Sequence, residues 1–159
     1  MANPDNAKGF YPVGHLNGGE IRTLPLKLGG TVYKGDLVSA GVAGTVTAAV
    51  ADDVAIVCGV ASEYGESGSV IGIWADPDII FGVQKSVAST IADVFSGMNH
   101  TAGAGNAKTK LSGHYLAGAG AQCQIIGLVE TPDNAWGTNQ DVKVLITEHA
   151  FILRAAITS

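Results

Sequence analysis

Charged side chains are scarce in this sequence. Only 14% of its residues are Asp, Glu, Lys or Arg, compared with roughly 25% in typical soluble domains. The 9 basic residues are spread singly along the chain and the formal net charge is −5, so no basic stripe could follow a phosphate backbone. We therefore expect no nucleic-acid partner. Because 47% of the residues are hydrophobic, much of the surface must be small and neutral, or covered by other subunits.

Long apolar runs and cysteines are also few. No run approaches the roughly 20 residues needed to cross a bilayer, and the start, Met-Ala-Asn-Pro-Asp-Asn, lacks the basic and apolar parts of a signal peptide. We expect no membrane partner and a protein made in a cytosol. Cys58 and Cys123 each lie inside an apolar run, which predicts two reduced, buried thiols rather than a disulfide.

Motifs that carry catalysis or hold cofactors are missing as well. The residues around Ser67 lack nucleophile-elbow spacing, and there is no Gly-x-x-x-x-Gly-Lys loop for phosphate. Asp76-Pro77-Asp78 lacks the spacing of a calcium loop and is interpreted as a turn. Four histidines stand singly, without metal-ligand spacing: His15, His100, His114 and His149. The sequence predicts no catalytic residue, no cofactor and no metal, although a metal shared between subunits stays open.

What the sequence does contain is a series of short apolar runs separated by glycine turns. Ile71–Gly82 is matched by a degenerate copy at Ile126–Gly137, which shares a Pro-Asp pair and an aromatic residue just before a glycine. Each copy predicts a strand, a turn and the start of a return strand, because proline has φ preset for a turn and Asp bonds the backbone ahead of it. A chance match in a Gly- and Ala-rich chain is the competing interpretation.

Strands recur at intervals of about ten residues, which is typical of a barrel or sandwich. Pro25 makes the first of them an edge strand, and the run 54–62 is apolar enough to be covered on both faces. The expected strands are 21–28, two short strands within 31–40 on either side of a Lys-Gly-Asp turn, 45–50, 54–62, 69–75, 115–117, 122–130, 141–148 and 150–157. The predicted fold class is all-β, mainly an antiparallel β-barrel or sandwich.

One short helix is expected around residues 86–98. Val87, Ile91, Val94, Phe95 and Met98 fall at helical spacing behind Ser86, a possible N-cap. The Gly-, Ala- and Asn-rich stretch 99–113 then predicts a long loop.

Residues 1–19 are predicted to form an N-terminal arm before a single β-rich domain, 20–159. The arm carries Phe10 and Tyr11, which either lie across their own domain or reach a neighbouring molecule. With Trp74 and Trp136 they are the candidate protein-contact residues, since aromatic side chains dominate interface hot spots. Core packing is the competing and commoner interpretation for both tryptophans.

Several phrases, in this order, carry a resemblance to a known family. They are Lys34–Val38, Ala75–Asp78 followed by Phe81, Leu111–Gly113, Ile126–Val129 followed by Pro132–Asn134, and Asp141–His149. Together they resemble small structural proteins of tailed-phage virions, in particular the capsid decoration or cement proteins. The resemblance covers about residues 30–149. The arm and the tail 151–159 have no counterpart, which leaves open which end touches the shell.

The resemblance implies a β-rich body, no enzymatic activity and no cofactor. It also implies binding to the outer surface of the major capsid protein lattice, shell stabilisation, and a homo-oligomer, often a trimer. The expected location is the capsid surface of the virion, after synthesis in the host cytoplasm.

Three alternatives to capsid decoration stay open. One is another virion role, such as a head fibre base or a head–tail protein. A second is a lipoyl- or biotinyl-like carrier domain, because Val32–Val38 contains a similar Lys-Gly-Asp turn, although neither Lys85 nor Lys108 lies in a carrier motif. A third is a small enzyme whose site forms between subunits, with His114 or His149 beside a carboxylate.

Overall fold

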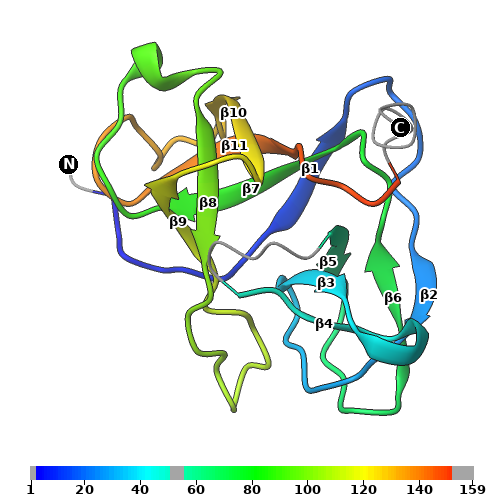
Figure 1. Ribbon diagram of the computed structural model, residues 1–159. Coiled ribbons are helices and arrows are strands. Elements are labelled where there is room, and N and C mark those ends of the chain that lie inside the picture. Colours follow the sequence, from blue (N-terminus) through cyan, green and yellow to red (C-terminus); the bar gives the residue numbers. More distant parts are fainter. Residues whose placement is uncertain (1–2, 51–55, 152–159) are drawn as a thin grey trace.

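The computed structural model describes residues 3–50 and 56–151, and these residues form two β-sheets (Figure 1). The all-β fold class predicted from the strand spacing is confirmed. The first sheet contains β1 (Tyr11–His15), β7 (Ile79–Lys85), β8 (Gly97–Thr101), β9 (Tyr115–Ala119), β10 (Cys123–Leu128) and β11 (Gln140–Ile146). The second contains β2 (Leu24–Lys27), β3 (Leu37–Ala40), β4 (Val46–Ala48), β5 (Val57–Ala61) and β6 (Val70–Trp74). The strand expected at 150–157 lies almost entirely outside the described residues.

Strands β7 to β11 close into a five-stranded barrel. The sheet order is β1-β7-β11-β10-β8-β9, and β9 returns to β7 through a parallel pairing of Leu116 with Lys85. The N–H of Ser86 adds a hydrogen bond of 3.0 Å to the carbonyl of Leu116. Strand β7 therefore pairs with β1 along its first half and meets β9 at its end. Closure satisfies backbone groups that would otherwise be exposed at sheet edges.

The second sheet has the order β2-β6-β5-β3-β4. Strand β2, which contains Pro25, lies at its edge as the proline predicted. All five residues of β5 are buried, as expected of a strand covered on both faces. The sheet separates two apolar clusters, because Leu37 of β3 packs into the larger cluster while Val38 packs into the smaller one.

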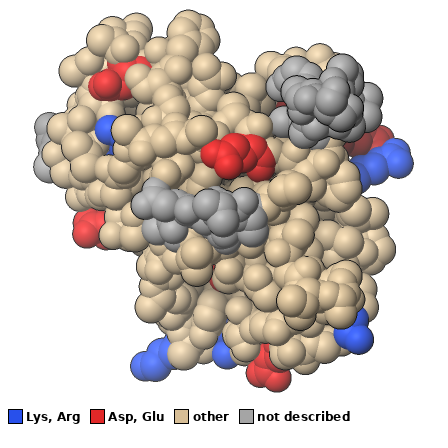
Figure 2. All heavy atoms as spheres, in the orientation of Figure 1, with Lys and Arg blue, Asp and Glu red and all other residues tan. Residues whose placement is uncertain are grey.

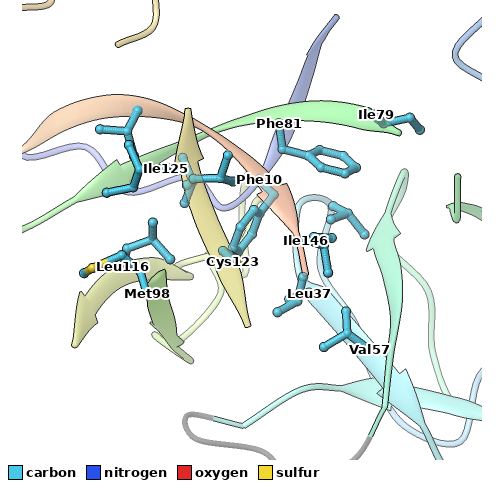
Figure 3. Packing of buried hydrophobic residues seen from close by; sticks show 14 of the residues in the cluster. Phe10, Leu37, Val57, Ile79, Phe81, Met98, Leu116, Cys123, Ile125 and Ile146 are labelled. Atoms are coloured by element: carbon cyan, nitrogen blue, oxygen red, sulfur yellow. The ribbon is translucent and has the colours of Figure 1, made fainter. Parts of the chain in front are cut away.

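The larger cluster fills the barrel and continues to the second sheet (Figure 3). Strand β11 alternates buried and half-buried residues, so that Val142, Val144 and Ile146 all point into this cluster. The rings of Phe10 and Phe81 meet edge to face, with centroids 6.4 Å apart and an interplanar angle of 86°. Apolar residues from both ends of the chain thus share one core.

The predicted N-terminal arm lies across its own domain. Tyr11–His15 forms β1 and pairs antiparallel with β7, and the side chain of Phe10 is only 1% exposed. The arm is therefore part of the barrel sheet and of its core.

The helix expected at 86–98 is wrong. Residues 86–96 connect β7 to β8 and contain a single 3-10 turn, η2 (Ile91–Asp93), while Gly97–Thr101 forms β8. A helix needs one continuous buried stripe, whereas Met98 points into the barrel and Ile91 and Phe95 are 74% and 73% exposed. A second 3-10 turn, η1 (Val42–Gly44), contains no regular helix either.

The two copies of the Pro-Asp motif have different places in the fold. In Ile71–Gly82, β6 and β7 belong to different sheets, so the turn at Pro77 carries the chain from one sheet to the other. In Ile126–Gly137, β10 and β11 pair directly and antiparallel. The local prediction of a strand followed by a turn is confirmed in both copies, but the return strand begins before Phe81 in the first and only after Trp136 in the second.

Candidate protein-contact surface

An exposed apolar turn projects from the barrel between β7 and β8. This apolar turn, residues 90–96, is the coiled segment above β10 in Figure 1. Ile91 and Phe95 are the most exposed large apolar side chains on it, at 74% and 73%. Most large apolar side chains fold inward, so two adjacent ones at this exposure mark a candidate contact surface.

An apolar hollow of about 630 Å³ lies directly beside the apolar turn. The turn forms one wall of the hollow, and β10 and Trp136 form the rest. The apolar lining is Ile91, Val94, Phe95, Ile126, Leu128 and Trp136. Glu130 and Lys143 also line it, with a carboxylate oxygen and the Lys143 Nζ 3.4 Å apart. On the face drawn in Figure 2, charged side chains are few and most of the surface is uncharged.

The apolar turn is held in one conformation by hydrogen bonds at both ends. Thr90 and Asp93 form a capping box, in which the Thr90 side chain accepts from Ala92 N–H and the Asp93 carboxylate accepts from Thr90 N–H. Phe95 N–H donates to the Ile125 carbonyl at 2.7 Å. The surface is therefore preformed.

Phe95 also has a backbone conformation that is unusual for an aromatic residue. Its φ is +75°, in the left-handed region where a side chain with a Cβ costs roughly 1–2 kcal/mol. Such strain persists only where surrounding contacts impose it, and it is concentrated at functional sites. Here the contacts with β10 impose it, and the result is a phenyl ring that points into solvent.

The four candidate contact residues have four different environments. Phe10 is buried in the core of its own chain and offers no surface to a partner in this conformation. Trp74 is half-buried and packs against Phe81, with ring centroids 6.4 Å apart. Trp136 is half-buried, packs against the same cluster and also lines the apolar hollow. Of the two tryptophans, only Trp136 therefore lies at the candidate contact surface.

Tyr11, the fourth candidate, lies flat across β7. It pairs with Gly82 of β7, and its hydroxyl donates to the carboxylate of Asp141 on β11 at 2.6 Å. Burial, followed by the hydrogen bond to the Asp141 carboxylate, raises the pKa of Tyr11 far above its usual value. The side chain spans three strands and links β1 to the barrel.

A buried polar cluster joins the two sheets but has no reactive arrangement. Burial raises the pKa of Asp36, and hydrogen bonds from Ser112 and from Tyr33 N–H act against that increase. Nε2 of His114 lies 3.4 Å from an Asp36 carboxylate oxygen. Nδ1 of His114 accepts from Leu37 N–H at 3.2 Å, so Nε2 carries the proton and no ring nitrogen is free to act as a base on Ser112.

Burial, and to a lesser extent the neighbouring His100, lowers the pKa of His114 to about 3. The His114 ring is therefore neutral at physiological pH. Because His114 and Asp36 are each only 3% exposed, the histidine–carboxylate pair that a small enzyme would need lies in the interior of one chain.

Three possible metal ligands, His15, Asp76 and Asp78, meet beside the first Pro-Asp turn. Nδ1 of His15 accepts from the N–H groups of Asn17 and Gly19, both at 3.1 Å, so Nε2 carries the proton and donates to Asp76 at 2.8 Å. A neutral histidine that binds a metal through Nε2 carries its proton on Nδ1. Here Nδ1 already accepts hydrogen bonds from two N–H groups, so a proton on Nδ1 would clash with both donors. The hydrogen bonds of this cluster fix the conformation of the turn. The sequence missed it because His15 is distant along the chain.

Both cysteines and Lys85 are buried. Cys58 and Cys123 are free thiols, as predicted, and burial raises the pKa of Cys123 to about 12. Lys85 is 6% exposed, and its Nζ donates to the Val87 carbonyl and to the Ser89 hydroxyl. A carrier lysine must be reachable by its modifying enzyme, so Lys85 does not fit that role.

Within residues 3–50 and 56–151, no helix has the length and apolar character needed to cross a membrane. Comparison of the sequence with protein-family models and with curated proteins found no match.

Proposed function

We propose that this protein is a structural component of a tailed-phage virion that decorates the outside of the capsid, binds the major capsid protein lattice and stabilises the shell. The phrases between residues 30 and 149 that resemble cement proteins suggest this role. The observation that carries the proposal is the apolar turn, because Ile91 and Phe95 are held in solvent on a rigid support. Preformed apolar contacts of this kind suit a binding protein.

The architecture suits a mechanical role. A shell under internal pressure is strengthened by a part that does not deform, and the barrel closes on itself through the β7–β9 pairing. Closure leaves few unpaired strands, so deforming the barrel requires many backbone hydrogen bonds to break together. Affinity for the lattice would come from repetition, since an oligomer such as a trimer engages several shell subunits at once.

The test is the number of copies in a purified particle. Quantitative mass spectrometry of gradient-purified virions is expected to give this chain in a fixed, high ratio to the major capsid protein. A few copies per particle would assign it instead to a fibre base or a head–tail part. Absence from the particle would refute a virion role altogether.

A second experiment measures function directly. Capsids stripped of this chain should release their contents at a lower temperature, and adding the purified protein back should restore the original value. Deletion of residues 1–19 is unsuitable here, because it would remove β1 and the core residue Phe10. Single substitutions at the surface are the appropriate perturbation.

A further inference from the structure

The buried ring of His100 faces an oxygen atom at each of its two nitrogens. His100 belongs to β8 of the barrel and is 1% exposed. Its Nδ1 lies 2.9 Å from Oε1 of Gln122, just before β10. Its Nε2 lies 3.0 Å from the carbonyl oxygen of Ala49, which follows β4 of the second sheet. A neutral imidazole has one N–H donor and one bare nitrogen, so it can donate to only one of these oxygens.

The orientation of the Gln122 amide is fixed by a further contact. Oε1 of Gln122 also accepts from the backbone N–H of His100, at 3.0 Å. Rotating the amide by half a turn would place its NH2 group against this backbone donor and leave the donor buried without an acceptor. The atom beside Nδ1 of His100 is therefore the oxygen of the amide.

We propose that His100 carries a proton on both ring nitrogens at neutral pH, and that the carboxylate of Asp36 balances the resulting positive charge. Each ring nitrogen then donates to the oxygen that it faces, and the ring joins β8 of the barrel to the end of β4 in the second sheet. Loss of either ring proton at alkaline pH breaks one of these two hydrogen bonds. The ring is therefore a pH-sensitive joint between the two sheets.

Asp36 is suited to balance the charge because donors surround its carboxylate. One carboxylate oxygen accepts from Tyr33 N–H at 3.0 Å, and the other lies 3.4 Å from the protonated Nε2 of His114. The side chain of Ser112 bonds to the carboxylate as well. A protonated carboxyl group would need an acceptor for its own hydrogen, whereas these neighbours offer hydrogens. The arrangement therefore fits the ionised form of Asp36.

Within the described residues, the titratable groups that face His100 are His114, before β9, and Asp36, before β3. The centroids of the His100 and His114 rings are 5.0 Å apart, and His114 is neutral because burial lowers its pKa to about 3. Burial raises the pKa of Asp36, whereas its hydrogen bonds and its attraction to His100 lower it. Gln122 and Ala49 face the ring from the other sides and carry no charge. A buried cation persists where it is hydrogen-bonded and has a counter-charge nearby.

The experiment counts the protons on each histidine ring. Long-range 1H–15N NMR spectra of the full, 15N-labelled chain at pH 7 distinguish a ring nitrogen that carries a proton from one that does not. We expect two protonated nitrogens on His100 and one on His114, which is the internal control because its Nδ1 accepts from Leu37 N–H. A bare ring nitrogen on His100 at this pH would overturn the proposal.

Asp36→Asn tests the counter-charge. This variant keeps the shape of the side chain and removes its charge, so we expect His100 to keep a proton on only one ring nitrogen at pH 7. Asp133→Asn is the matched control at an exposed aspartate, and it should leave the His100 signals unchanged. A folded Asp36→Asn protein with both His100 protons would show that Asp36 does not balance the charge.

Gln122→Glu provides a second variant, which decides the matter if Asp36→Asn does not fold. The glutamate keeps an acceptor oxygen beside Nδ1 of His100 and adds a negative charge there. We expect the pH at which His100 loses its second proton to rise by at least one unit relative to the wild type. An unchanged or lower value in a folded Gln122→Glu protein would refute the contact between Nδ1 and the side chain at position 122, and the proposal with it.

Discussion

The effect of a substitution at Gly82 on the free energy of unfolding is expected to depend strongly on the side chain at position 11. The Tyr11 ring crosses over Gly82 on its way to Asp141, and a Cβ added at Gly82 would lie 2.5 Å from Cζ of Tyr11. Gly82 lies within β7 without a positive φ, so alanine there meets no backbone penalty. The prediction is that Gly82→Ala destabilises the wild type and stabilises a variant in which Tyr11 is alanine.

The magnitude follows from what the displaced ring loses. In the wild type the ring must move away from Gly82, which breaks a hydrogen bond to a carboxylate worth roughly 1.5–3 kcal/mol. Replacing a strand glycine by alanine gains about 0.5–1 kcal/mol when nothing clashes. The net cost in the wild type is then about 1–2 kcal/mol. In the Tyr11→Ala background only the gain remains, so the coupling energy equals the lost hydrogen bond, about 1.5–3 kcal/mol.

Urea unfolding of the wild type, both single variants and the double variant gives the four free energies of unfolding. Gly14→Ala is the matched control on β1, because a Cβ there has Ile80 Cδ1 at 3.9 Å as its nearest neighbour, an ordinary contact. It should change stability equally in both Tyr11 backgrounds. If Gly82→Ala also has the same effect in both backgrounds, Tyr11 does not pack over Gly82 as described.

Three further predictions concern the interior. Burial lowers the pKa of His114 from 6.5 to about 3, so the folded state binds fewer protons than the unfolded state below pH 6.5. The free energy of unfolding should fall by up to about 1.4 kcal/mol per pH unit from this group as the pH drops toward 4. Denaturant titrations at a series of pH values should show that the free energy of unfolding falls less steeply with decreasing pH in His114→Gln. The raised pKa of Asp36 opposes this pH dependence. Cys123, whose pKa burial raises to about 12, should react with Ellman's reagent only after denaturation; rapid reaction of the native protein would contradict its burial. Gly59→Ala should cost about 3 kcal/mol or more, because φ is +142° and the new Cβ would lie 2.2 Å from the Trp74 carbonyl oxygen; an unchanged melting temperature would contradict that contact.

The sequence predicted most strands because their signals are local. Pro25 excludes a ladder donor and so predicts an edge, and β2 is an edge. The apolar run 54–62 predicts cover on both faces, and β5 has it. Closure of the barrel could not be predicted in this way. Closure depends on one pairing, between Lys85 of β7 and Leu116 of β9. The apolar pattern of neither strand indicates which strand it pairs with.

The arm shows a different limit. Residues 1–19 lack periodicity because β1 is short and has a register shift between Pro12 and Gly14. Its attachment depends instead on contacts distant in the sequence, Phe10 with Phe81 and Tyr11 with Asp141. A single sequence shows that two aromatic residues must dock, but it does not show where the partner surface lies.

The candidate contact surface was hidden for a physical reason that applies beyond this chain. Helical spacing of apolar residues predicts one buried face only if the segment is a helix, and Phe95 at a φ of +75° shows that it is not. The same residues then divide: Met98 enters the barrel, while Ile91 and Phe95 face solvent. The apolar residues that predicted one buried helix face therefore include the two that are exposed on the apolar turn. The local signal for a turn was the capping box of Thr90 and Asp93. A helix that starts at this box would have only a few residues before β8 begins at Gly97.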